Sequence, residues 1–458
     1  MTLWELLLRE NGRPAGTLGD RRETLALAAL ERASCLQGSL KALRGRCVML
    51  RVSDQLTAAV ALIELDGVAQ RMVVCPPGVA SEHLPSVIRT AGCDAWVGDG
   101  GSGPAPAECA LSLQIEVSPV PQSRSEMRSR FNDTEWVLLT SGTTGVPKLV
   151  RHTLASLINF IDQSPSRATW STFYDIRRYG GLQILLRALC GGSMVLSSPE
   201  ESTESFLSRA GAQGVTHISG TPSHWRKTLM SGAAGRFAPE YVRLSGEIAD
   251  QGILDGLRGA FPTALVAHAF ASTEAGVGFE VEDGQAGFPA SLVGASRHGV
   301  EMDVSRGTLR IRSPGNALGY LGDVPPLRDP DGFVNTGDRL DLREGRHHFI
   351  GRSGGIINVG GLKVHPEEVE AVINSHPAVR MSLVKARPNP ITGAVVTADV
   401  VLNSFAAPGS DPDGEQRMRQ EILGVCRAGL AAHKVPALIH FVTTLAVSPS
   451  GKLVRPNA

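Results

Sequence analysis

The stretch that decides the fold of this chain is Val137-Leu138-Leu139-Thr140-Ser141-Gly142-Thr143-Thr144-Gly145-Val146-Pro147-Lys148. Its apolar start predicts a strand, which runs into a loop of hydroxyl residues and glycines that ends in a lysine. Glycine lets main-chain N–H groups approach an anion closely. Hydroxyls donate hydrogen bonds to phosphate oxygens, and Lys148 adds a mobile positive charge. The stretch therefore predicts a loop that binds a polyphosphate.

Two other interpretations of this loop fit less well. A phosphate loop of the Walker type needs the spacing Gly-x4-Gly-Lys-Ser/Thr, which is absent here. A polar surface turn would explain the serine, threonine and glycine content alone. It would not explain the apolar strand before the loop or the Pro147-Lys148 pair after it.

Helical patterns alternate with short apolar runs on both sides of the loop, which predicts a parallel sheet covered by helices. We expect strands at residues 46–52, 70–75 and 216–219, and helices at 58–65 and 204–211. Beyond Gly287, strands at 308–313 and 346–350 are joined by Gly, Pro and Asp turns. The expected fold class is α/β, with a large N-terminal domain of mixed sheets layered with helices.

The last part of the chain predicts a separate, small α+β domain. His365-Pro366-Glu367-Glu368 should open a helix, because proline suits the first turn and acidic residues suit its positive end. A strand at 395–401 and a second helix at 415–432 should follow. We therefore divide the chain into residues 1–352 and residues 353–458.

The phosphate loop resembles the signature loop of the adenylate-forming superfamily, which includes acyl-CoA and aryl-CoA ligases, peptide-synthetase adenylation domains and firefly luciferase. Further segments occur in the order of that superfamily, so the resemblance covers nearly the whole chain. The longest match, Gly351-Arg352 with residues 356–370, is most similar to acyl-CoA and aryl-CoA ligases. The resemblance implies that residues 1–352 bind AMP and the acid, and that residues 353–458 form a mobile lid.

The resemblance also implies roles for individual residues on the nucleotide. Phe270-Ala271-Ser272-Thr273-Glu274 resembles an aromatic-Gly-x-Thr-Glu turn, with alanine in place of the usual glycine. It implies Phe270 near adenine, Thr273 on the α-phosphate and Glu274 on Mg²⁺. One glutamate suffices there, because Mg²⁺ between phosphates needs only one or two carboxylates and waters. Gly246 and Glu247 are implied to lie against adenine. The phosphate-loop residues implied to bind the nucleotide are Thr140, Ser141, Gly142, Thr143, Thr144 and Gly145.

Three motifs toward the C-terminus complete this resemblance. Asn335-Thr336-Gly337-Asp338 resembles a Thr-Gly-Asp motif and implies Asp338 as the acceptor for both ribose hydroxyls, which one carboxylate can accept together. Arg352 is implied on the ribose or phosphate. Gly354 stands at the hinge, where relatives often carry an acidic residue. Residues 448–455 resemble the C-terminal lysine motif, and Lys452 is implied to bridge the carboxylate and the α-phosphate, acting with Thr273 and Lys148 in catalysis.

The acid pocket is inferred from position alone. Family members line the acid where Phe173, Arg178, Tyr179 and Gly180 fall, and His224 and Trp225 are further candidates. A peptide-synthetase domain would carry an aspartate for the substrate amino group where Arg178 stands. This departure disfavours an α-amino acid as the substrate.

The implied activity is ATP-dependent activation of a carboxylic acid to acyl-AMP, followed by thioester formation with coenzyme A, with ATP, Mg²⁺ and coenzyme A as cofactors. One alternative is a stand-alone adenylation enzyme that loads the acid onto a carrier protein. A second is a non-catalytic nucleotide-binding scaffold, and a third is a Walker-type NTPase, which would release ADP.

The charge balance and the cysteine content restrict the classes of partner and the compartment. Lys plus Arg equals Asp plus Glu at 45 each, which gives no electrostatic footprint for nucleic acid or an anionic membrane. We expect no membrane span and no secretory signal. The 7 cysteines lack a Cys-x-x-Cys pair, which fits reduced cytosol. We therefore expect a cytoplasmic enzyme, monomer or homodimer, that meets a small carboxylic acid.

Overall fold

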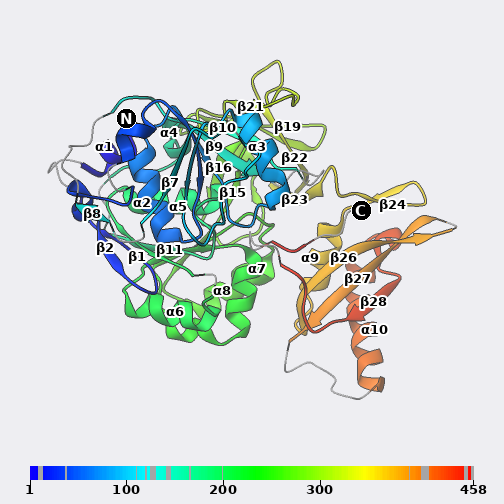
Figure 1. The fold of residues 1–458 in the computed structure, drawn as a ribbon. Helices are drawn as coiled ribbons and strands as arrows, with labels where there is room; N and C mark the ends of the chain where they lie inside the picture. Colours follow the sequence, from blue (N-terminus) through cyan, green and yellow to red (C-terminus); the bar gives the residue numbers. More distant parts are fainter. Residues whose placement is uncertain are drawn as a thin grey trace.

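The computed structural model describes residues 1–8, 14–36, 39–109, 111–118, 121–123, 130–140, 146–164, 167–198, 200–390, 392–403, 412–447 and 452–454 (Figure 1). A large N-terminal domain of sheets and helices is followed by a small C-terminal domain beside it. The expected fold class is confirmed.

The first sheet carries the phosphate-loop hairpin, with the strand order β21-β10-β9-β5-β4-β6-β7. In it, β9 (Glu135–Thr140) pairs antiparallel with β10 (Lys148–His152) and parallel with β5 (Arg71–Val74). Its other strands are β4 (Cys47–Arg51), β6 (Ala95–Gly98), β7 (Leu113–Glu116) and β21 (Gly319–Leu321). The strands expected at 46–52 and 70–75 are confirmed, because short apolar runs define them locally.

Helix α2 (Gln55–Leu65) joins the first two sheets into one core. Asp54 caps its N-terminus by accepting a hydrogen bond from the Thr57 main-chain N–H, and all its residues are buried. The apolar core around it includes residues of β4, β9 and β12. Other short elements of this domain are α1 (Leu3–Leu8), β3 (Ala33–Ser34), α3 (Leu84–Ala91), β8 (Gln122–Ser123) and α4 (Leu154–Ile158).

The second sheet has the order β16-β15-β14-β13-β11-β12-β1-β2. From β12 to β15 the neighbouring strands are parallel, so their carboxyl ends share one edge. The strands are β1 (Thr17–Gly19), β2 (Thr24–Ala26), β11 (Thr169–Thr172), β12 (Ser193–Leu196), β13 (His217–Gly220), β14 (Tyr241–Ser245), β15 (Leu265–Ser272) and β16 (Gly276–Val281). The helices are α5 (Tyr179–Leu189), α6 (Thr203–Ala212), α7 (Pro222–Met230) and α8 (Gln251–Ala260).

A third, antiparallel sheet completes the N-terminal domain, with the order β17-β23-β22-β20-β19-β18. Its inner face packs on β16 through Phe279, Phe288 and Leu309. Its strands are β17 (Phe288–Pro289), β18 (Ser296–Arg297), β19 (Val300–Ser305), β20 (Thr308–Arg312), β22 (Val334–Arg343) and β23 (Arg346–Arg352).

The C-terminal domain has its own apolar core and lies beside the third sheet (Figure 1). Its elements are β24 (Ile357–Val359), β25 (Leu362–Val364), α9 (Pro366–Asn374), β26 (Val379–Asn389), β27 (Gly393–Leu402), α10 (Pro412–Gly429) and β28 (Leu438–Phe441). The second helix was expected to reach residue 432, but it ends at Gly429. The chain is already extended at Ala431, which precedes a short 3₁₀ turn.

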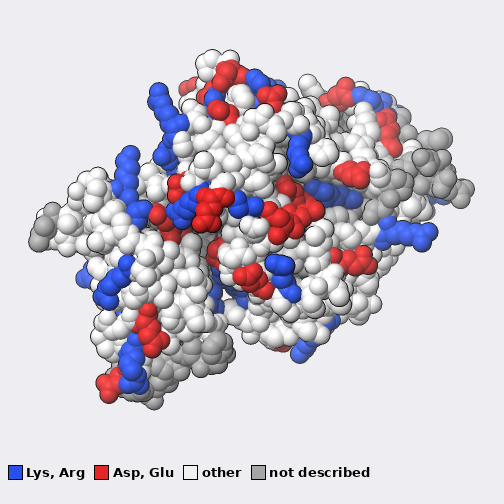
Figure 2. Space-filling view, turned by 180° about the vertical axis from the view of Figure 1, so that it is seen from behind, with Lys and Arg blue, Asp and Glu red and all other residues white. Residues whose placement is uncertain are grey.

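The surface mixes charges of both signs. Figure 2 shows Lys and Arg interspersed with Asp and Glu on the face that it presents. Within the described segments, no helix combines the length and apolarity needed to cross a bilayer.

Candidate active site

The phosphate-loop hairpin places Lys148 opposite Thr140, at the ends of β10 and β9. The Lys148 ammonium lies 5.4 Å from the centre of the Tyr320 ring. The Tyr320 hydroxyl in turn donates to Glu274 Oε1 at 3.5 Å. Tyr320, which no sequence motif indicated, therefore contacts Lys148 through its ring and Glu274 through its hydroxyl. Ser141, Gly142, Thr143, Thr144 and Gly145 fall outside the described residues.

Thr273 follows β15 at the carboxyl edge of the second sheet and is held by a buried histidine. His152 Nε2 lies 2.7 Å from the Thr273 carbonyl oxygen, and its Nδ1 lies 2.9 Å from Ser156 Oγ. A carbonyl only accepts, so Nε2 carries the proton. Burial lowers the pKa of His152 to about 4, which keeps the ring neutral. His152, the last residue of β10 in the first sheet, thus holds the main chain just after β15 of the second sheet.

Asp338 and Arg352 are cross-strand partners on β22 and β23. Arg352 Nε lies 3.4 Å from Asp338 Oδ1, and Arg352 Nη2 donates to the Thr336 carbonyl at 2.9 Å. Burial raises the pKa of Asp338, and Arg352 opposes that shift. The Arg352 side chain is 68% exposed, so it keeps donors that a ligand can reach.

Lys452 approaches this region from the C-terminal domain. A Cβ built on Gly246 would lie 3.4 Å from Lys452 Cε. The Leu453 main-chain N–H donates to Glu247 Oε1 at 3.0 Å, while Glu247 Oε2 accepts from the Ser223 N–H at 2.9 Å. Glu247 therefore ties the lysine segment to the start of α7.

Residues from several of the predicted motifs act electrostatically on the ammonium of Lys452. Solvent still reaches this residue. Surrounding protein nevertheless lowers the pKa of Lys452 by desolvation, and Glu247 opposes that shift. Arg352, Asp338 and Glu274 also act on the ammonium. Groups predicted from separate motifs thus lie within electrostatic reach of one lysine.

The residues expected near the acid and the adenine occupy aromatic clusters. Phe173 stacks on His224 at 5.2 Å between ring centroids, and it meets Trp225 edge-on at 5.3 Å. Trp225 is fully buried and its indole donates to the Arg243 carbonyl at 3.3 Å. Phe270 stacks on Phe349 at 5.5 Å. The buried Trp225 thus packs against the Phe173 ring and supports it.

Arg178 and Tyr179 start helix α5. Arg178 occupies the N-cap position without a side-chain cap bond, and its buried Nε has no acceptor among the described residues. Tyr179 is buried with its ring 5.8 Å from that of His152. Gly180 is exposed, and a Cβ there would meet the Tyr174 ring at 3.8 Å. The assignment of these residues to the acid remains a prediction.

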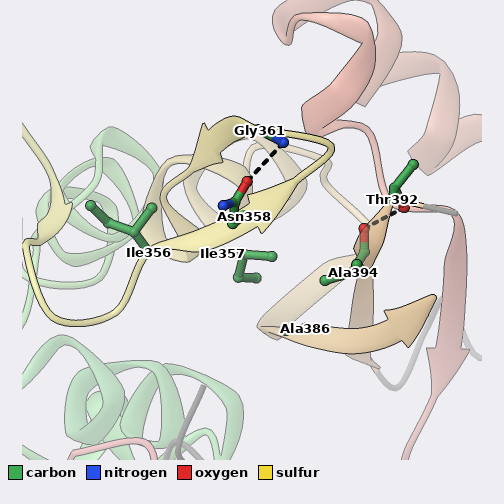
Figure 3. Close-up of a pocket in the computed structure, with 8 residues that line it drawn as sticks. Ile356, Ile357, Asn358, Gly361, Ala386, Thr392 and Ala394 are labelled. Carbon is green, nitrogen blue, oxygen red and sulfur yellow. Dashed lines mark hydrogen bonds between the residues drawn. The ribbon is translucent and has the colours of Figure 1, made fainter. Parts of the chain in front are cut away.

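The predicted hinge lies in open surroundings. A Cβ at Gly354 would meet no atom within 4 Å in the described structure. Beyond it, a hollow of about 380 Å³ separates the β24–β25 hairpin from β26 and β27. Figure 3 shows Asn358 accepting from the Gly361 N–H and the Thr392 hydroxyl donating to the Ala394 carbonyl at its rim.

Two profiles of known protein families match this chain. The profile of the AMP-binding enzyme family matches residues 28–321, and the profile of its C-terminal domain matches residues 368–452. The chain belongs to the AMP-binding enzyme family. Both profiles fall within the two domains described above.

Curated relatives in the AMP-binding family use different acceptors. The chain is 26% identical over 357 residues to the fatty acid–[acyl-carrier-protein] ligase MmaC of Mycobacterium marinum, covering 70% of this chain and 66% of that protein. It is 31% identical over 259 residues to the 2-succinylbenzoate–CoA ligase of Salmonella typhimurium, covering 54% of this chain and 53% of the relative. The chain thus matches about half to two thirds of the length of these relatives.

A solved AMP-binding structure shares the whole architecture. The anthranilate CoA ligase AuaEII, in complex with anthranoyl-AMP, aligns with a TM-score of 0.81 at 18% identity. The alignment covers 99% of this chain and 95% of that one. At this identity the likeness establishes the fold.

Proposed function

We propose that this chain activates a carboxylic acid with ATP, forming acyl-AMP and pyrophosphate, and then transfers the acyl group to the thiol of coenzyme A. The observation that carries the proposal is the hydrogen bond from the Leu453 N–H to Glu247, which holds Lys452 of the C-terminal domain beside Gly246. Glu247, Asp338 and Glu274 also act electrostatically on the Lys452 ammonium. A non-catalytic nucleotide-binding scaffold would need no lysine from a second domain at this place.

In the first step, a carboxylate oxygen attacks the α-phosphorus of ATP and the bond to pyrophosphate breaks. Lys452 would neutralise the approaching carboxylate and the α-phosphate, which otherwise repel each other. Asp338 would accept hydrogen bonds from the ribose hydroxyls, and Lys148 would neutralise the leaving pyrophosphate. Glu274 fits a Mg²⁺ site, because one carboxylate suffices beside substrate phosphates, and the metal would supply charge neutralisation there.

In the second step, the thiol sulfur attacks the acyl carbon and AMP leaves with the bonding electrons. We propose that the lid, residues 353–458, rotates about Gly354 between the two steps, since a few residues can absorb such a change. The hollow beside Gly361 then becomes part of the surface that faces the thiol.

Coenzyme A is favoured over a carrier protein by the hinge segment, residues 351–370, which resembles CoA ligases. The experiment is pyrophosphate release with a panel of aryl, short, medium and long acids, with coenzyme A or carrier proteins as acceptors. AMP and a CoA thioester are the expected products. A carrier thioester without a CoA thioester would favour the loading enzyme. ADP, or no acid-dependent pyrophosphate at all, would refute adenylation.

A further inference from the structure

One group of polar side chains is not used by the two steps above. Arg187 comes from the last turn of α5, Tyr241 and Arg243 from β14, and Glu280 from β16. Arg243 is only 3% exposed. Arg187 lies on α5, the helix that begins at Tyr179, a residue expected in the acid pocket, and both arginines act electrostatically on the Tyr179 hydroxyl.

The charges of this group do not balance within the described residues. Arg243 Nε donates to Glu280 Oε2 at 2.7 Å, and the Tyr241 hydroxyl donates to Glu280 Oε1. Burial would raise the pKa of Glu280, but Arg243 and Arg187 hold it at about 2, so the carboxylate is ionised. Two guanidinium groups therefore share one carboxylate, and one positive charge is left over.

That extra charge belongs to Arg187. In the described part of the chain, the Arg187 side chain forms no hydrogen bond or ion pair, and its Nε is buried without an acceptor. Its guanidinium stands 6.0 Å from the centre of the Trp170 ring. Burial and repulsion from Arg243 lower the pKa of Arg187. A partly buried cation whose side chain makes no hydrogen bond among the described residues is costly, so a ligand that neutralises it would be favoured.

Further donors point to an anion as that ligand. Arg243 uses Nε for Glu280, and no described residue accepts from its other two nitrogens. The Tyr179 hydroxyl likewise has no hydrogen-bond partner among the described residues, although Tyr179 is 6% exposed. Guanidinium nitrogens and a phenol together match the oxygens of a carboxylate, which arginine can bind with two parallel hydrogen bonds.

We infer that Arg187, Arg243 and Tyr179 bind a second carboxylate of the acid substrate, remote from the carboxylate that is adenylated. The inference rests on the proposed function and specifies its substrate class as dicarboxylic acids. It also gives the Arg187 charge an anionic partner, which a monocarboxylic acid with an apolar tail would not supply.

The first test compares dicarboxylic acids with their monoamides, which keep the shape and lose one charge. Pyrophosphate release should give the dicarboxylate a kcat/KM at least about 30-fold higher, the lower end for a buried charge pair. Arg187→Met should remove this ratio by lowering the rate with the dicarboxylate alone, and Arg187→Lys should restore part of it. The KM for ATP should not change. Equal rates with the dicarboxylic acid and its monoamide in the wild type would overturn the inference. Equal losses with both acids in Arg187→Met would overturn it as well.

The second test needs no catalysis. A dicarboxylate alone should raise the Tm of the wild type but not of Arg187→Met, and an equal rise with chloride or sulfate would overturn the inference. If no acid releases pyrophosphate while this shift persists, the proposed function fails and the anion site stands. Arg187→Met itself should fold with an equal or higher Tm, because the attraction of Arg187 to Glu280 is opposed by its repulsion from Arg243 and by its burial. Arg258→Met, an exposed arginine in the last turn of α8, is the matched control.

Discussion

Glu247 accepts the main-chain N–H of Leu453 at 3.0 Å, across 206 residues of sequence. The other carboxylate oxygen accepts from the Ser223 N–H at the start of α7. This carboxylate connects the two domains next to Lys452. The C-terminal domain is therefore placed with Lys452 beside residues that we propose bind the nucleotide.

Glu247→Ala should slow acyl-AMP formation by roughly 10- to 100-fold, because hydrogen bonds to a charged group contribute about 1.5–3 kcal/mol. Conversion of supplied acyl-AMP to the thioester should be unchanged, since it does not require this position of the lid. Glu247→Gln keeps one acceptor oxygen, so its rate of acyl-AMP formation should lie between those of the wild type and Glu247→Ala. Rapid-quench measurement of each half-reaction checks this, and equal losses in both would contradict it.

Glu274→Gln should keep the fold but lower adenylation by on the order of 10²–10³, because the amide loses the charge that holds Mg²⁺. Raising the Mg²⁺ concentration should recover part of the rate. The control is Glu282→Gln, an exposed glutamate beyond β16. Unchanged turnover of the Glu274 variant at limiting Mg²⁺ would show that Glu274 does not hold the metal.

Asp338→Ala should weaken ATP binding by roughly 10- to 100-fold, because the ribose hydroxyls lose a charged acceptor. ATP and GTP should be affected alike, since the base is recognised elsewhere. Asp341→Ala, on the same strand and paired with Arg343, is the control. Calorimetric affinity for ATP equal to that of the wild type would refute the ribose role.

His152 should make folding stability depend on pH. Its pKa falls from 6.5 to about 4 in the folded chain, so its contribution is complete above pH 6.5. As the pH falls from 6.5 toward 4, only the unfolded chain takes up the proton, and stability is lost. Between pH 7 and pH 5 the loss should be about 2 kcal/mol, and His152→Gln should remove that part. Denaturant unfolding at both pH values measures it, and identical pH dependence in the variant would contradict it.

The sequence predicted what short runs of residues determine. Strands such as β5 and β20 follow from local apolar runs, and the start of α9 follows from Pro366 and the acidic residues after it. The motif residues near Lys452 were predicted by resemblance, and Glu247, Asp338, Arg352 and Glu274 act electrostatically on its ammonium.

The remaining contacts depend on packing between distant segments. Nothing near Leu453 indicates that Glu247 accepts its N–H, and nothing near Tyr320 indicates that it contacts Lys148 and Glu274. Arg187 has the sequence context of an ordinary cation at a helix C-terminus. Only the arrangement of α5 against β14 and β16 reveals that the Arg187 side chain makes no hydrogen bond or ion pair among the described residues.

The most direct test of the account is the single-turnover rate of each half-reaction in Lys452→Ala. The account predicts a loss on the order of 10²–10³ in acyl-AMP formation, typical for one preorganised charge donor, with normal conversion of supplied acyl-AMP to the thioester. An acyl-AMP formation rate equal to that of the wild type, or equal losses in both steps, would contradict it.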